Sequence, residues 1–110
     1  INKPETKIKF IKIKKNMGWC DDVKYPKKYN CLIETSSKVK HEKLYRSDHK
    51  YDLLIPIKYN YKKKVVGRGS CIFMHLTSNY NPTAGCIALK KKDYLIMLKL
   101  IDKNTKIRIS

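Results

Sequence analysis

The sequence predicts a mainly β domain that carries one clear α-helix. Short apolar or alternating segments, separated by polar loops, fill most of the chain, whereas residues 91–101 carry apolar side chains at helical spacing. With 110 residues, of which 42% are hydrophobic, the chain is long enough for one domain with one modest core. No internal repeat, low-complexity tract or linker divides it.

The first half of the chain is expected to hold one strand and a long irregular segment. Residues 7–14 nearly alternate basic and apolar side chains, and a one-residue slip at Phe10–Ile11 indicates a β-bulge. Residues 18–30 include proline, asparagine and paired aspartates, which favour a loop over a β-ladder. Residues 41–48 fit either a short helix or a turn.

The second half has stronger patterns. Residues 51–59 predict a strand, and Pro56 indicates a sheet edge or a bulge because proline cannot donate to a ladder. Turns follow, and the apolar residues 70–76 predict a second strand. After a polar loop comes the helix 91–101, with a carboxylate in its first turn, where the macrodipole favours negative charge. Alternation over residues 105–109 predicts a closing strand.

The chain is strongly basic, with 26 Lys and Arg against 9 Asp and Glu and a net charge of +17. Such a balance is often found in proteins that bind nucleic acid, a lipid surface or a carboxylate-rich polymer. Here the basic residues are nearly all lysine, in a chain also rich in Ile, Asn and Tyr, which favours a general compositional bias. No basic region has the aromatic spacing of an RNA-binding signature, so we expect no specific nucleic-acid partner.

Four cysteines occur, at positions 20, 31, 71 and 86, without a C-x-x-C motif, and the three histidines fall at no zinc-finger spacing. We therefore expect no metal site and no other cofactor. Cys20 and Cys31 are candidates for a disulfide in an oxidising compartment, but their spacing does not decide it. No apolar run approaches the roughly 18 residues of a membrane-spanning helix, and these residues contain no signal-peptide pattern.

Two residues stand out for their chemistry. His75 ends the apolar strand, and Cys86 follows a loop and Gly85. A loop that returns to the strand end would bring imidazole and thiol together, and an imidazolium stabilises a nucleophilic thiolate. Gly85 permits a sharp turn, so the amides of Gly85 and Cys86 are candidates for an oxyanion hole. The alternative is a buried thiol and a structural histidine.

Several short sequence segments, taken in order, resemble those of one known family. A strand ending in His75, a loop, the element Thr83-Ala84-Gly85-Cys86, a helix and a closing strand resemble the C-terminal half of the L,D-transpeptidase catalytic domain (YkuD-type). Upstream, the words GWCDD, YN, HEKLYR and YDLLI resemble a Gram-negative-type branch of that family. The resemblance covers roughly residues 17–109.

This resemblance implies a YkuD-like β-sandwich and a cysteine acyltransferase that acts on peptidoglycan stem peptides in the periplasm or cell envelope. Cys86 would attack the donor tetrapeptide to form a thioester, and His75 would be its base, oriented by a backbone carbonyl. Thr83 and the backbone of Gly85 and Cys86 would line the site, with Arg46, Arg68 and Trp19 as further substrate-binding candidates. For Trp19 a place in the core or its rim is the competing interpretation, and Arg46 is also expected to pair with Asp48.

The sequence departs from the family pattern in two ways. Many members carry Arg two residues after the nucleophile, where this chain has Ala88, so a fork-shaped donor for a substrate carboxylate is missing. The Gly-Asp…Thr-Pro-x-Gly segment that usually precedes this region has no match, so we expect residues 1–110 to be one domain of this type without its N-terminal strands. Inactivity of such a shortened domain is then a further alternative.

Two other functions remain open on the sequence. An L,D-carboxypeptidase or another cysteine hydrolase would share the acyl-enzyme and replace the acceptor amine with water. A non-catalytic basic β-domain would instead hold an anionic polymer without chemistry. The sequence indicates no particular oligomeric state.

Overall fold

The fold is built from two small sheets and one helix. The computed structural model describes residues 4–35, 38–78 and 86–108. Within them the strands are β1 (Met17–Cys20), β2 (Leu32–Glu34), β3 (His41–Lys43), β4 (Leu54–Pro56), β5 (Phe73–Leu76) and β6 (Ile87–Leu89), followed by the helix α1 (Lys91–Leu100). These described residues are mainly β with one helix, as the sequence predicted, and their two sheets are consistent with a YkuD-like β-sandwich.

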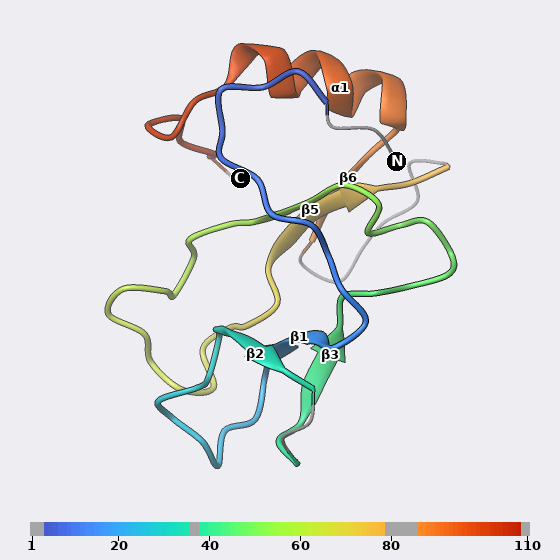
Figure 1. Cartoon of the computed structure of the whole chain (residues 1–110). Coiled ribbons are helices and arrows are strands. Elements are labelled where there is room, and N and C mark those ends of the chain that lie inside the picture. Colours follow the sequence, from blue (N-terminus) through green and yellow to red (C-terminus); the bar gives the residue numbers. More distant parts are fainter. Residues whose placement is uncertain (1–3, 36–37, 79–85, 109–110) are drawn as a thin grey trace.

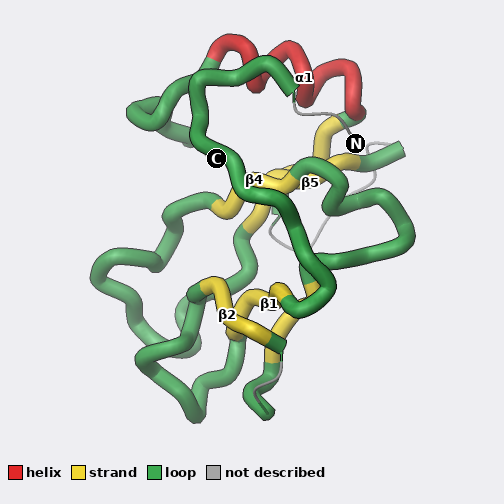
Figure 2. Tube along the Cα trace, in the orientation of Figure 1, coloured by secondary structure: helices red, strands yellow, loops and turns green. Residues whose placement is uncertain are grey.

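The first sheet has the strand order β2-β1-β3 and the second β4-β5-β6. All pairs are antiparallel except β5 with β6, which run parallel. Viewed from the side, α1, the β4-β5-β6 sheet and the β2-β1-β3 sheet follow one another from top to bottom (Figures 1 and 2). The second sheet is therefore the middle layer.

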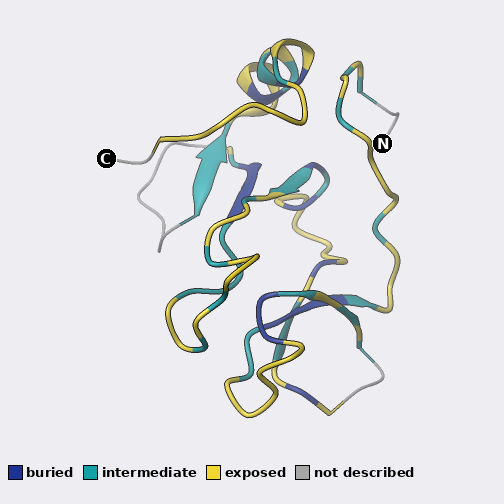
Figure 3. Cartoon of the chain, turned by 90° about the vertical axis from the view of Figure 1, so that its left-hand side faces the viewer, coloured by how far each residue is buried: buried dark blue, intermediate teal, exposed yellow. Residues whose placement is uncertain are grey.

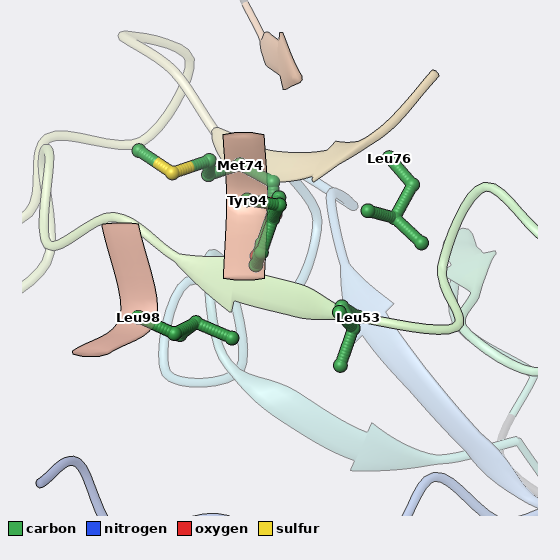
Figure 4. Close-up of a cluster of buried hydrophobic side chains, with 5 residues drawn as sticks. All are labelled: Leu53, Met74, Leu76, Tyr94 and Leu98. Atoms are coloured by element: carbon green, nitrogen blue, oxygen red, sulfur yellow. The ribbon is translucent and has the colours of Figure 1, made fainter. Parts of the chain in front are cut away.

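Strand β5 is the centre of this arrangement, and all four of its residues are buried (Figure 3). Successive side chains on a strand point to opposite faces. Met74 and Leu76 belong to a cluster with Leu53, Tyr94 and Leu98, which joins the middle sheet to α1 (Figure 4). Phe73 belongs to a second cluster, with Trp19, Leu44 and Tyr51. Because both faces of β5 are covered, its sequence is a continuous apolar run instead of an alternating one.

The helix follows its sequence pattern closely. Residues 91–100 are helical, with Asp93 in the first turn and Lys99 in the last, both on the side that the macrodipole favours. Tyr94 and Leu98 are spaced one helical turn apart and bury the inner face. The Tyr94 hydroxyl also donates to the carbonyl of Met74 at 2.9 Å, which fixes α1 to β5.

Strand β1 differs from the sequence-based prediction, in which residues 18–30 form an irregular loop. Instead Met17–Cys20 is the central strand of its sheet, paired on both edges. Three of its four residues are buried, and this burial outweighs the local loop signals. Gly18 is needed for close packing, because a Cβ there would lie 2.8 Å from the ring of His41 on the neighbouring strand. A second unexpected strand, β2, pairs beside it.

Three further expectations need correction. Residues 7–14 form no strand: Ile13 packs on the second cluster, but Phe10 and Ile11 are exposed. Residues 105–108 are likewise outside any strand, although they alternate. The strand expected over 51–59 is confined to Leu54–Pro56, at the sheet edge that its proline predicted. Alternation describes a half-buried segment, and a ladder also needs a partner strand.

Candidate active site

Both residues singled out for chemistry lie at the junction between the two sheets. In the parallel register His75 on β5 is opposite Ala88 on β6, and Cys86 comes directly before β6. Positions two apart share a face of a sheet, so Cys86 is placed on the same face as Ala88 and His75. Cys86 packs against the cluster that contains Phe73 and Tyr51, the side of β5 that faces away from α1. The fold thus places Cys86 and His75 on the same face of the second sheet.

His75 is held in a defined orientation. Its residue is only 9% exposed, and its Nδ1 lies 2.9 Å from the carbonyl oxygen of Leu76. A carbonyl only accepts hydrogen bonds, so this contact requires the proton to be on Nδ1. In the neutral ring Nε2 then carries a lone pair and is able to take up a proton. A backbone carbonyl, that of Leu76, thus orients the imidazole.

Cys86 has its thiol directed at the backbone before β5. Its Sγ donates to the carbonyl oxygen of Cys71 at 3.3 Å. Cys71 itself has a φ of 59°, a left-handed conformation that is unusual for a residue with a side chain. This backbone turn leads into β5, which carries His75, so one short segment carries both the acceptor of the Cys86 thiol and the imidazole.

The other thiols differ from Cys86 in their surroundings. Burial raises the pKa of the Cys71 thiol to about 12, and the carboxylates of Glu42 and Asp21 act in the same direction. Cys20 is completely buried, and Cys31 accepts a hydrogen bond from the ammonium of Lys64 at 3.3 Å. Cys20 and Cys31, which the sequence left as a candidate pair, are not joined by a disulfide.

Glu42 of β3 is linked through Tyr51 to the region of His75. The Tyr51 hydroxyl donates to Glu42 Oε1 at 2.5 Å, and the Arg46 guanidinium lies over the Tyr51 ring, 4.9 Å from its centre. The expected pair of Arg46 with Asp48 is present, with both nitrogens of the guanidinium fork on the carboxylate. This hydrogen-bonded pair lowers the pKa of Asp48 to about 2 and raises that of Arg46.

Comparison with known proteins decides the family. The sequence matches the family model YkuD, the L,D-transpeptidase catalytic domain, over residues 7–109. The chain belongs to the L,D-transpeptidase catalytic domain family. Neither the curated proteins nor the solved structures contain a significant match to it. This family acts on peptidoglycan.

The remaining residues expected to line an L,D-transpeptidase site are spread more widely. Trp19 lies in the core, 7% exposed, with its Nε1 donating to Asn30 Oδ1 at 2.8 Å, so its surroundings agree with the core interpretation and its ring is not a surface platform. Arg68 is exposed in the loop before β5. Thr83 and Gly85 lie outside the described residues, so of the two amides expected at the oxyanion only that of Cys86 belongs to them. Asp22 caps its own loop by accepting from the amides of Lys24 and Lys40.

The sequence did not reveal the surroundings of His75. In the sequence-based prediction Tyr51 belongs to the strand over residues 51–59, Glu42 to a short helix or turn, and Cys71 to the apolar strand over residues 70–76, and none of them is a site residue. The signal that pointed toward two of them was their position in the words YDLLI and HEKLYR, which carried the resemblance. Among the described residues no cluster of His, Cys, Asp and Glu is arranged to hold a metal ion, and no helix has the length and apolarity to cross a membrane.

Proposed function

We propose that this chain is a cysteine acyltransferase that acts on peptidoglycan stem peptides, with Cys86 as nucleophile and His75 as base. The observation that carries the proposal is the orientation of His75. Its Nδ1 is occupied by the Leu76 carbonyl, which leaves Nε2 to accept a proton on the face of β5 where Cys86 packs. Membership of a family that acts on peptidoglycan supports the substrate class.

In the proposed first step His75 Nε2 takes the proton of the Cys86 thiol, and the sulfur attacks the carbonyl carbon of the third residue of a donor tetrapeptide. A tetrahedral oxyanion forms, for which the amides of Gly85 and Cys86 are the proposed donors. When it collapses, the bond to the terminal D-amino acid breaks. His75 protonates the departing amine, and a thioester on Cys86 remains.

In the second step an amine of another stem peptide attacks the thioester carbonyl. His75 accepts the proton of that amine and returns a proton to the Cys86 sulfur as the new amide forms. If water replaces the amine, the same thioester gives a carboxylic acid, so a carboxypeptidase would differ only in the acceptor. With Ala88 opposite His75 instead of an arginine, we propose that the donor's carboxylate is bound elsewhere, with Arg68 as the exposed candidate.

Mass spectrometry of the intact protein after incubation with a short tetrapeptide tests the proposal. We expect a covalent adduct on Cys86, absent from Cys86→Ala and present in Cys71→Ala. Added acceptor amine should release the adduct as a cross-linked peptide, whereas release of free acid alone would identify the hydrolase. Absence of any adduct, together with tight binding of polyanions, would favour the non-catalytic binding domain.

The proposed location of the protein is the periplasm or cell envelope, because the proposed substrate polymer is found there. Fractionation of cells that express the natural gene, followed by detection of the protein in envelope and cytosolic fractions, tests this. Recovery in the cytosolic fraction alone would contradict it.

A further inference from the structure

Tyr51 occupies the space between β3 and the face of β5 that carries His75. Its ring centre lies 5.6 Å from that of His75, with the planes tilted by 56°, and 5.7 Å from that of Phe73, in an edge-to-face contact. Phe73 and His75 are neighbours on one face of β5. A single ring, only 6% exposed, therefore contacts two successive side chains of that face.

The ring of Tyr51 is itself fixed at its polar end. The hydroxyl donates to Glu42 Oε1, and Glu42 belongs to β3, where its backbone is paired with Trp19 of β1. The Arg46 guanidinium lies against the ring and 4.0 Å from the same Glu42 oxygen. The position of the ring is thus set by the first sheet, whereas the imidazole that it contacts belongs to the second.

We infer that Tyr51 is a positioning residue for His75. Its ring holds the imidazole where Nδ1 meets the Leu76 carbonyl and Nε2 is kept for proton transfer, and the bond to Glu42 holds the ring in place. The inference rests on the proposed acyl transfer, and it adds a residue that acts through His75 without touching the substrate. The hydroxyl donates its proton to a carboxylate and so does not donate it to the reaction. It is therefore the ring of Tyr51, and not the hydroxyl, that positions His75.

Two substitutions of Tyr51 separate the ring from the hydroxyl. Tyr51→Phe keeps the ring but cuts its bond to Glu42, so its kcat should fall by only about threefold. Tyr51→Leu removes the ring, and kcat for acyl transfer should fall by about tenfold or more, because misplacing a catalytic group by about 1 Å costs up to about 100-fold. In both variants KM should change by less than about threefold, since Tyr51 does not bind substrate. Tyr45→Leu, at an exposed tyrosine two residues after β3, is the matched control and should leave both constants unchanged.

The His75 tautomer gives a readout that simple core packing would not move. Nitrogen NMR should show the proton on Nδ1 in the original protein and in Tyr51→Phe, and a mixture of tautomers in Tyr51→Leu. The iodoacetamide reaction of Cys86 should slow in parallel with kcat. Both measurements work without peptidoglycan. Failure of the original protein to form an acyl-enzyme would therefore refute the proposed function. The inference about His75 would still be tested by the tautomer and by the alkylation rate.

Glu42 supplies a second, milder pair of variants in case Tyr51→Leu does not fold. Glu42→Gln keeps an acceptor for the hydroxyl and should retain kcat, whereas Glu42→Ala cuts the same bond as Tyr51→Phe and should lower kcat by a similar factor of about three. The inference is overturned if kcat and the His75 tautomer are unchanged when the ring is removed by Tyr51→Leu, or if kcat is unchanged when the anchor is cut by Tyr51→Phe or Glu42→Ala. It is also overturned if Tyr51→Phe loses as much kcat as Tyr51→Leu.

Discussion

The thiol of Cys86 donates to the backbone carbonyl of Cys71 at 3.3 Å, and Cys71 holds a left-handed φ of 59°. These two cysteines lie 15 residues apart in the sequence, and their side chains have different surroundings. One presents its side chain to the face shared with His75, and the other offers it a backbone acceptor while its own thiol stays protonated. The contrast gives direct predictions about reactivity and about the backbone.

Limited alkylation should distinguish the four thiols. We expect iodoacetamide to modify Cys86 first near neutral pH, because in the proposed mechanism His75 takes the thiol proton and so gives access to the thiolate. Cys71 should react slowly, since burial raises its pKa to about 12, and Cys20 is inaccessible. Peptide mapping by mass spectrometry measures the order, and His75→Ala should slow labelling of Cys86. Earlier labelling of Cys71 or Cys31 would remove Cys86 from the nucleophile's role.

The backbone at Cys71 should tolerate glycine and reject valine. Glycine adopts a positive φ freely, so Cys71→Gly should unfold at nearly the same urea concentration as Cys71→Ala. A β-branched side chain is strained in the left-handed region, and Cys71→Val should lose about 1–2 kcal/mol of unfolding free energy relative to Cys71→Ala. All three proteins lack the Cys71 thiol, so loss of the thiol does not contribute to the differences among them. Equal stability of the Val and Ala variants would contradict the observed conformation.

Asn30 should be among the most sensitive polar residues. It is 3% exposed, accepts from Trp19 Nε1, and donates to the carbonyls of Tyr59 and Asn60 at 3.0 and 2.7 Å. Asn30→Ala leaves the buried Trp19 Nε1 and two partly buried carbonyls without this partner and should cost about 2–4 kcal/mol of unfolding free energy. The exposed Asn104→Ala should cost less than about 0.5 kcal/mol. Urea denaturation followed by Trp19 fluorescence measures both, and similar losses would refute the structural role of Asn30.

Stability should fall at alkaline pH. Burial raises the pKa values of Cys71, Tyr51 and Tyr94 in the folded chain, whereas in the unfolded chain these groups ionise at their ordinary values of about 8.5–10. Above that range the unfolded state binds fewer protons than the folded state, so the free energy of unfolding decreases as pH rises. We expect a loss of roughly 1 kcal/mol per group per pH unit, measured as the urea midpoint between about pH 8 and 11. In Tyr94→Phe the slope should be smaller, and an unchanged midpoint in the original protein would contradict the burial of these groups.

The positive charge should act on binding to the polymer and not on the chemical step. Peptidoglycan stems carry carboxylates, so attraction to a chain of net charge +17 should weaken steadily as salt screens it. Acylation of Cys86 by a saturating tetrapeptide should change little over the same range. Cosedimentation with sacculi, with DNA as competitor, measures the first effect. Tight, steeply salt-dependent DNA binding without acyl-enzyme formation would favour the non-catalytic polyanion binder.

The sequence by itself determined the features that depend on local pattern. Helix α1 follows from apolar spacing over a single segment, and β5 from an unbroken apolar run. The order of His75 and Cys86 predicted a shared site because a loop between them has only to return to the strand end. Pro56 marked a sheet edge for an equally local reason, the missing amide proton.

Only the tertiary structure decided which segments pair and what surrounds His75. Residues 7–14 alternate yet form no strand, while Met17–Cys20, with loop signals around it, is a central strand. Strand pairing is non-local, and short segments with similar propensities compete for the same edges, so burial against distant residues chooses among them. The contact of Tyr51 with His75 depends on the same choice, because Tyr51 is bonded to Glu42 of one sheet and contacts His75 of the other, which requires those sheets to pack.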